Sequence, residues 1–398
     1  MKPLQGIKVL DLSRVLAGPL CTQLLADLGA EVLKIERPGA GDDTRHWGPP
    51  WHGEGENRVA AYFLSCNRGK KSAAIDFAQP AGAALVRRLA QDTDVVVENF
   101  KVGGLKKFGL DATALQTANP RLIYASITGF GQEGPYADRA GYDFIIQGMG
   151  GMMSITGIPD GEPGGGPMRA GVAIADLFTG MYSCSAILAA LYGRERTGEG
   201  VHIDLALFDT QLAVLANQAE NALISGKDPP RQGNTHPNIV PYQPFDAADQ
   251  PIIIAVGNDR QFARLAEICG HPEWTSEERF ASNGARVAHR TEMVDLVGNT
   301  IRQKPAAQWL EQLGAAGIPA GPINTITQAL ADVQAQHRQM VRTLAGVPLV
   351  GSPVRLDGER ADSDLPPPAL GQHTEDVLAA LDLAAEEFER LRAANVVG

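Results

Sequence analysis

The sequence predicts an α/β protein with two domains, of which the larger has a Rossmann-like parallel sheet and the smaller is of the α+β type. Two observations carry this prediction. The 398 residues are too many for one ordinary hydrophobic core. Short apolar runs also alternate with helical stretches through the first half of the chain, which is typical of a parallel sheet with helices on both faces.

The alternation begins with two β-branched runs, 7–11 (IKVLD) and 31–36 (EVLKIE), separated by a helical stretch at 19–28 that ends at Gly29. It continues with runs of the same kind, predicted as a strand at 72–77, a helix at 80–91, and strands at 94–99, 121–127 and 168–175 (MRAGVAIA). The last strand is expected to lead into a long helix that ends near 193–200.

The domain boundaries follow from turn-forming segments. A polar connector rich in Pro and Gly covers 225–238, and strand-and-loop sequence resumes after 316–325. We therefore expect a discontinuous large domain, a small domain and two linkers, at 1–200 with 335–398, at 225–325, and at 201–224 with 326–334.

Composition and charge exclude several classes of partner. The formal net charge is −11, from 35 Lys+Arg against 46 Asp+Glu, which argues against nucleic acid or a membrane as a partner. The apolar stretch 170–192 is broken by Asp176 and is expected to be a buried helix. The four cysteines form no C-x-x-C pair, and the first residues carry no signal-peptide pattern, so we expect a cytoplasmic protein.

Familiar cofactor motifs are missing from the sequence. The turn after the first strand reads DLSRVLAGPL and has a single glycine where a dinucleotide fingerprint would have three, so NAD is not expected, although Glu36 ends the second strand where a ribose-binding acid would lie. The eight histidines have no metal-ligand spacing, and we expect no metal.

Two features remain as candidates for chemistry. Asp176 lies between the strand expected at 168–175 and a helix, where a carboxylate is placed either to act on a ligand or to cap the helix, and spacing alone leaves both open. Basic residues gather early in the chain and indicate either an anion site or a solvated surface, with the surface favoured: Lys34, Arg37, Arg45, Arg68, Lys70 and Lys71.

Several segments together resemble the class III CoA-transferases, the CaiB/BaiF type. They include GIKVLDLSRVLAGP, ADLGAEVLKIERPGAGDDTR, ITGFGQEGPYADRAGYD, GVAIADLFTG, GNTHPNIVPYQPF and PPPALGQHT, and they extend over nearly the whole chain. The resemblance implies that Asp176 is the nucleophile. It also implies a CoA site formed by Val15, Arg37, Ile75, Asn99, Phe100 and Lys107.

The chain departs from some members of that family. Formyl-CoA transferase has a glutamine where Leu16 stands, and a longer glycine-rich loop where residues 233–238 stand. The related racemases have a histidine base where Tyr142 stands, and tyrosine, with a pKa near 10, exchanges protons poorly at neutral pH. A 2-methylacyl-CoA racemase or epimerase, a formyl-CoA:oxalate type of transferase and a non-catalytic CoA-binding protein are the alternatives.

Within the family, the likeness is greatest to the branch that uses succinyl-CoA and dicarboxylic acids such as glutarate. The resemblance implies transfer of CoA through an aspartyl-acyl anhydride and an aspartyl-CoA thioester, by an interlocked homodimer. A second substrate carboxylate needs a cationic or polar anchor, for which the candidates are Arg45, Arg139, Tyr142, Arg169 and His236.

Overall fold

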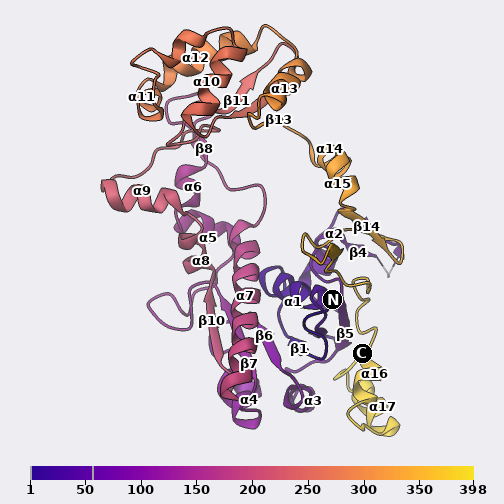
Figure 1. The fold of residues 1–398 in the computed structure, drawn as a ribbon. Helices are drawn as coiled ribbons and strands as arrows, with labels where there is room; N and C mark the ends of the chain where they lie inside the picture. The colour runs from indigo at the N-terminus through magenta and orange to yellow at the C-terminus, as the bar shows by residue number, and fades with distance from the viewer. Residues whose placement is uncertain (1, 56–57) are drawn as a thin grey trace. The chain divides into compact units, whose positions relative to one another are not determined.

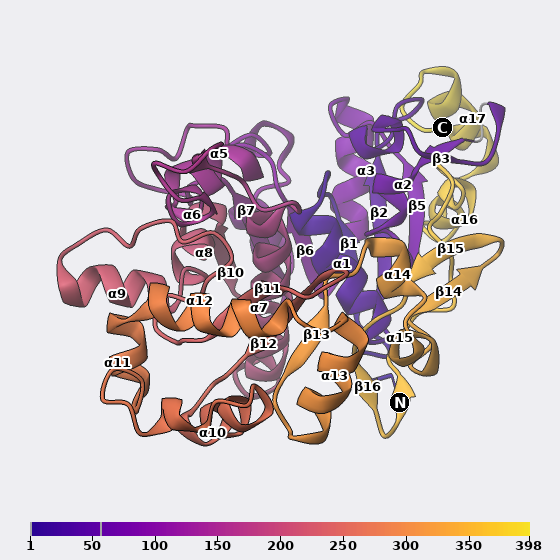
Figure 2. The ribbon, with the colours of Figure 1, turned by 90° about the horizontal axis from the view of Figure 1, so that it is seen from above.

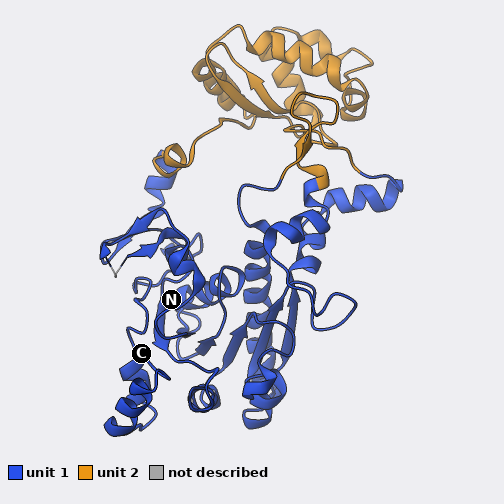
Figure 3. Cartoon of the chain, turned by 180° about the vertical axis from the view of Figure 1, so that it is seen from behind, with its two compact units in different colours: residues 1–153, 169–228, 333–398 blue, residues 154–168, 229–332 orange. Residues whose placement is uncertain are grey.

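The computed structural model describes residues 2–55 and 58–398. The chain divides into two compact units, coloured in Figure 3: residues 1–153, 169–228 and 333–398 form the first, and 154–168 and 229–332 form the second. Residues 154–168 were expected in the large domain, but they belong to the second unit.

The first unit is built on a six-stranded parallel sheet with the order β10-β7-β6-β1-β2-β5 (Figure 1). Its strands are β1 (Lys8–Asp11), β2 (Glu31–Glu36), β5 (Lys70–Ala74), β6 (Val95–Glu98), β7 (Ile123–Thr128) and β10 (His202–Ala206). The chain adds β2 and β5 on one side of β1 and then β6, β7 and β10 on the other. This is the Rossmann strand order, with its switch point between β1 and β6.

Both faces of the central strands are buried, which explains the continuous apolar run of β6. Val95 and Val97 point into a core that includes α1 and α7, whereas Val96 points into the opposite core, against α3 and the C-terminal helices. Figure 2 shows α16 next to β5, where the backbone N–H of His373 donates to the Ser72 carbonyl at 2.9 Å. The last residues of the chain therefore complete the first unit.

The helices of the first unit are α1 (Ala17–Asp27), α2 (Ala61–Leu64), α3 (Pro80–Gln91), α4 (Ala112–Ala118), α5 (Asp143–Met149), α7 (Ile174–Thr197), α8 (Leu207–Ala213), α9 (Asn217–Ser225), α15 (Val333–His337), α16 (Thr374–Ala379) and α17 (Ala385–Ala393), with the 3-10 turns η1 (Asp43–His46) and η3 (Lys106–Phe108). Three short ribbons accompany them: β3 (Trp51–His52) with β4 (Val59–Ala60), β14 (Val341–Leu344) with β15 (Val347–Val350), and β16 (Arg355–Leu356) with β17 (Glu359–Arg360). By length and composition, α7 alone among the described helices could cross a bilayer, and its inner face packs on α1.

The second unit has its own core, formed by a three-stranded antiparallel sheet and the helices against it. Its elements are β8 (Gly157–Ile158), β9 (Gly166–Pro167), β11 (Tyr242–Asp246), β12 (Pro251–Ala255), β13 (Ala320–Pro322), α10 (Asp259–Ile268), η4 (Pro272–Thr275), α11 (Asn283–Ala288), α12 (Arg290–Ile301), α13 (Ala306–Ala315) and α14 (Ile326–Leu330), and α6 (Met152–Ile155) crosses the boundary between the units.

Three expectations about elements are wrong. The strand expected at 168–175 is absent: residues 168–173 are irregular, and Ile174 begins α7. The expected linker 201–224 contains β10, the edge strand of the large sheet, and two helices. The expected linker 326–334 likewise contains α14 and the start of α15.

Candidate active site

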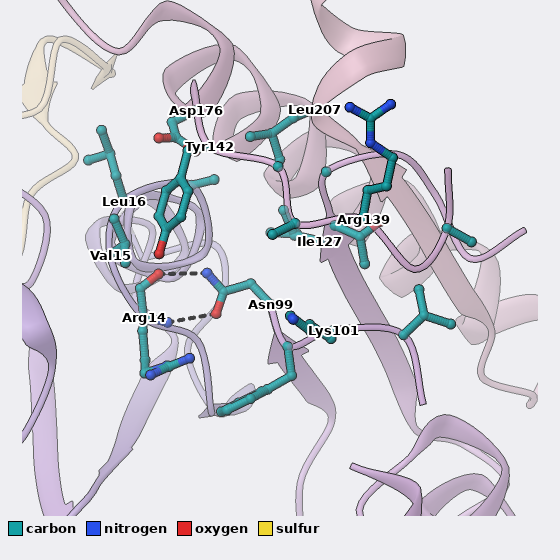
Figure 4. A pocket seen from close by; sticks show the side chains of 18 residues that line it. Arg14, Val15, Leu16, Asn99, Lys101, Ile127, Arg139, Tyr142, Asp176 and Leu207 are labelled. Atoms are coloured by element: carbon teal, nitrogen blue, oxygen red, sulfur yellow. Dashed lines mark hydrogen bonds between the residues drawn. The ribbon is translucent and has the colours of Figure 1, made fainter. Parts of the chain in front are cut away.

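A cavity opens at the carboxyl ends of β1, β6 and β7, beside the switch point where ligands of such sheets bind. We call it the Asp176 cavity (Figure 4). Its lining consists of residues after these strands together with the starts of three helices: Arg14, Val15, Leu16, Ala17, Asn99, Phe100, Lys101, Val102, Ile127, Thr128, Gly129, Ala137, Arg139, Ala140, Gly141, Tyr142, Asp176 and Leu207.

Asp176 lies in the first turn of α7, three residues after the N-cap Ala173. The interpretation of Asp176 as a cap is therefore wrong. The start of α7 is capped by the carboxylate of Asp143, which is distant in the sequence. Asp143 Oδ1 accepts from the backbone N–H of Ala175 at 2.8 Å and from that of Asp176 at 3.4 Å. The side chain of Asp176 is thus left facing the cavity.

The surroundings of Asp176 favour its protonated form. Burial, and then the charge of Asp143, raise the pKa of Asp176 to about 7. Among the described residues, none donates a hydrogen bond to the Asp176 carboxylate. The partly buried carboxylate therefore has no hydrogen-bond donor from the described part of the chain when it ionises, which is a condition expected of a reactive nucleophile.

Tyr62 lies close enough to this pair to respond to both charges. Burial, and then the charge of Asp176, raise the pKa of Tyr62 to about 12, with a further contribution from Asp143. Its phenol is therefore protonated at neutral pH and can act only as a hydrogen-bond donor or neutral acceptor there.

A second cavity lies at the carboxyl ends of β2 and β5, and we call it the Arg37 cavity. It is lined by Leu12, Arg14, Lys34, Ile35, Glu36, Arg37, Gly41, Asp42, Asp43, Ile75, Asp76, Phe77, Ala78, Phe100 and Phe108. Arg14 and Phe100 line both cavities, and the Arg14 guanidinium lies 4.9 Å from the centre of the Phe100 ring. The two cavities are therefore adjacent along one edge of the sheet.

The residues predicted for CoA divide between the two cavities. Val15 and Asn99 line the Asp176 cavity, Arg37 and Ile75 line the Arg37 cavity, and Phe100 lines both. Lys107 lines neither; it is exposed in η3, with its ammonium 4.8 Å from the centre of the Phe108 ring.

The candidate anchors for a substrate carboxylate are more scattered. Arg139 and Tyr142 line the Asp176 cavity, and both are exposed. Arg169 is exposed outside it, 5.8 Å from the centre of the Phe144 ring, and His236 belongs to the second unit. Arg45 is buried and binds Glu36 through two hydrogen bonds of 2.7 and 2.8 Å, so it does not face the Asp176 cavity.

For the basic residues early in the chain, the sequence favoured a solvated surface. That prediction is wrong for most of them. Arg37 and Lys71 are exposed, but the other four side chains are buried in ion pairs. These pairs are Lys34–Asp42 at 3.0 Å, Arg45–Glu36 at 2.7 Å, Arg68–Asp27 at 2.6 Å and Lys70–Asp11 at 3.0 Å. The partners are far apart in the sequence in two of the four cases, Arg68–Asp27 and Lys70–Asp11, so local charge patterns could not reveal these two.

Sequence reasoning missed Asp143 as a part of the site. Asp143 stood in the quoted segment AGYD, but its contact with α7 depends on the packing of α5 against α7. Within residues 2–55 and 58–398, no cluster of three His, Cys, Asp or Glu side chains is arranged to hold a metal ion.

A Rossmann-like sheet with a reactive carboxylate beside its switch point is typical of an enzyme rather than of a binding module. The chain belongs to CoA-transferase family III, which it matches over residues 4–374, and it is therefore an enzyme that transfers CoA.

Its relatives cover nearly its whole length. It is 52% identical to succinate–glutarate CoA-transferase of Agrobacterium fabrum, over 96% of both chains, and 42% identical to human succinyl-CoA:glutarate CoA-transferase, over 95% of this chain and 86% of the relative. The crystal structure of a CaiB/BaiF family protein from Brucella suis superposes with a TM-score of 0.85 at 52% identity, covering 96% of this chain and 99% of that one.

Proposed function

We propose that this enzyme moves CoA from succinyl-CoA to a dicarboxylic acid of the glutarate type, with Asp176 as the nucleophile. The observation that carries the assignment to Asp176 is its unpaired carboxylate, whose pKa is raised to about 7, in a cavity at the switch point. The choice of substrates is supported by the names of relatives that are 52% and 42% identical to the chain.

The proposed reaction proceeds through two kinds of covalent intermediate on Asp176. An Oδ atom of ionised Asp176 attacks the thioester carbonyl of succinyl-CoA, and the CoA thiolate leaves, so that a succinyl-aspartyl anhydride forms. The thiolate then attacks the Asp176 carbonyl, and succinate departs with the bridging oxygen. The acceptor carboxylate attacks the resulting aspartyl-CoA thioester, and CoA returns to the acceptor through the same two steps in reverse.

The two adjacent cavities supply a place for each end of acyl-CoA. The exposed guanidinium of Arg37 suits the phosphates of the nucleotide end, and the apolar side chains of Ile75 and Phe100 suit its adenine. The thioester then lies in the Asp176 cavity, beyond the shared residues Arg14 and Phe100. Binding energy from the nucleotide end can thereby lower the barrier at the thioester.

For the second carboxylate of the substrate, Arg139 is the anchor that we propose. It is the arginine among the candidates that lines the same cavity as Asp176 and that has no acidic partner within hydrogen-bond reach among the described residues. Its guanidinium lies 4.5 Å from the centre of the Tyr136 ring, which orients the side chain without neutralising its charge.

We also propose that the enzyme is a homodimer. The outer face of α7 carries large apolar side chains that are about half exposed, among them Met181 at 53% and Tyr182 at 47%. Leu223 and Ile224 of α9 are exposed as well, at 76% and 84%. Apolar groups of this kind on one unit indicate a surface that a second chain covers.

Formation of glutaryl-CoA from succinyl-CoA and glutarate tests the assignment. Asp176→Asn should reduce the rate by roughly a thousandfold or more, because an amide cannot attack the thioester. Asp209→Asn is the matched control, since Asp209 is an exposed acid in the first turn of α8, and it should keep the native rate. Near-native turnover by Asp176→Asn would refute the role of Asp176.

The same assay tests the anchor when the acceptor is varied. Arg139→Met should raise the KM for glutarate by roughly tenfold but leave the KM for butyrate, which has no second carboxylate, almost unchanged. Equal effects on the two acids would remove Arg139 from this role, and a native enzyme that prefers oxalate would overturn the proposed substrate class.

A further inference from the structure

Residues 13–15, in the turn between β1 and α1, have their backbone N–H and carbonyl groups bound by side chains. The N–H of Ser13 donates to Asp11 Oδ1 at 2.9 Å, and its carbonyl accepts from Lys34 Nζ at 2.7 Å. The amide of Asn99 binds both polar groups of the Arg14 backbone, at 2.8 and 2.6 Å (Figure 4).

Val15 completes this segment. Its N–H donates to both carboxylate oxygens of Asp42, at 3.2 and 3.3 Å, and its carbonyl faces the Cys66 thiol at 3.7 Å. Residues 13–15 therefore follow neither a helical nor a sheet pattern, and side chains from four other segments determine their conformation.

That conformation is unfavourable in itself. Val15 has φ = 71°, in the left-handed region, which side chains branched at Cβ adopt at a considerable cost. Such strain persists only where surrounding contacts oppose it. The contact that acts directly on the strained residue is the one with Asp42, because it binds the N–H of the peptide group that determines this φ angle.

Asp42 is itself fixed. It is buried, and its Oδ2 lies 3.0 Å from the ammonium of Lys34, which is also fully buried. Asp42 Oδ1 accepts from the N–H and the hydroxyl of Thr44 at 3.0 and 2.8 Å. The Lys34–Asp42 pair thus connects the end of β2 to Ser13 on one side and to Val15 on the other.

The strained residue lies at the site of the chemistry. Val15 lines the Asp176 cavity, and Leu16 and Ala17, whose directions depend on the Val15 torsion angles, line it too. Relaxation of Val15 into the ordinary region of φ would turn these residues and change the shape of the cavity beside Asp176.

We propose that Asp42, held by Lys34, is a positioning residue for CoA transfer, and that it acts by keeping Val15 in the left-handed conformation. Asp42 does not touch the reacting atoms. Its contribution is to select the one conformation of residues 13–15 in which acyl-CoA lies correctly against Asp176. This role rests on the function proposed above, because the rate of CoA transfer is what reports it.

A double-mutant cycle between Asp42 and Val15 tests this role. Asp42→Asn keeps the shape of the side chain but has one acceptor oxygen, so it cannot serve both Thr44 and the side facing Lys34 and Val15. Without that contact the left-handed state of Val15 is sparsely populated, and kcat/KM for succinyl-CoA should fall about tenfold. In the Val15→Gly background, Asp42→Asn should lower kcat/KM by less than about threefold, because glycine adopts positive φ without strain.

Two controls accompany the cycle. Asp209→Asn makes the same chemical change at an exposed position that lines neither cavity, and it should leave kcat/KM unaltered. Circular dichroism and thermal melting establish that each variant is folded. If Asp42→Asn does not fold because Lys34 loses its partner, Lys34→Met combined with Asp42→Asn removes both buried charges, and this pair is then compared in the two Val15 backgrounds.

Two outcomes overturn the proposal. Equal losses of kcat/KM in the Val15 and Val15→Gly backgrounds would show that Asp42 acts independently of this torsion angle. A lowered melting temperature with unchanged kcat/KM would show that Asp42 only stabilises the fold. An unmodified enzyme without CoA-transferase activity on succinyl-CoA would instead refute the proposed substrates, so the two failures are distinguishable.

Discussion

At the scale of single residues, the relation between Asp176 and Asp143 combines structural support with electrostatic tuning. Asp143 binds the first N–H groups of α7 and so fixes the helix turn that carries Asp176. The same negative charge adds to the effect of burial and raises the pKa of Asp176 to about 7. The carboxylate is thereby made more basic, and more reactive when ionised, than an exposed aspartate.

The pH dependence of the rate should show this tuning. Only ionised Asp176 attacks, so kcat/KM for succinyl-CoA should rise with pH through about 7 and then level off. Asp143→Asn removes the like charge but not the burial. The pKa of Asp176 should then be lower, so the rise of kcat/KM with pH should occur at lower pH. Because burial still raises this pKa, the rise should remain at higher pH than for an ordinary exposed aspartate.

A control separates this local effect from a general change of charge. Asp138→Asn alters an exposed acid in the loop before Arg139 and should not change the pH at which kcat/KM rises. If Asp143→Asn does not change the pH at which kcat/KM rises, Asp143 only caps α7 and does not tune the pKa of Asp176. The sequence displayed both aspartates, but their contact requires α5 and α7 to pack together, which no local pattern encodes.

At the scale of elements, one face of α7 is packed against α1 and the opposite face is exposed. Its inner face packs against α1 so closely that a Cβ on Gly180 would lie 2.7 Å from the Ala17 carbonyl oxygen. Its outer face exposes Met181, Tyr182 and Tyr192. The apolar composition predicted this helix, but not its start at Ile174, because the residues before it resemble a strand in sequence and are irregular in the structure.

The outer face of α7 should be covered in the proposed homodimer. Met181→Glu places a charge on this face without affecting the buried side, and it should raise the dimer dissociation constant by tenfold or more, because an unpaired charge is costly in an apolar interface. Sedimentation velocity of the variant and of Glu199→Gln, an exposed control beyond the end of α7, measures the effect. A native protein that sediments as a monomer at micromolar concentration would contradict the dimer.

At the scale of the whole molecule, the sequence predicted the parallel sheet well but not all of its strands. The runs at 7–11, 31–36 and 94–99 became β1, β2 and β6, because their β-branched and other apolar residues fill buried positions of the sheet. The edge strand β10 was mistaken for a linker, because its residues alternate between exposed and partly buried positions. Its alternating sequence, HIDLA, was the signal that could have identified it.

The candidate site was predicted as separate residues rather than as an arrangement. The resemblance implied Asp176, Val15 and Asn99, and the structure places all three around one cavity. The buried pair of Lys34 and Asp42 was not foreseen, since a charge cluster in a sequence gives no information about which charges are desolvated. Burial and pairing are properties of the folded sheet edge.

The most direct test of the central claim follows oxygen into Asp176. In the proposed reaction, the oxygen that bridges the second anhydride comes from the acceptor acid and stays on Asp176 when CoA leaves for that acid. Enzyme incubated with succinyl-CoA and ¹⁸O-labelled glutarate, then digested and analysed by mass spectrometry, should carry heavy oxygen in the peptide that contains Asp176. Turnover that leaves this carboxylate unlabelled would contradict the account.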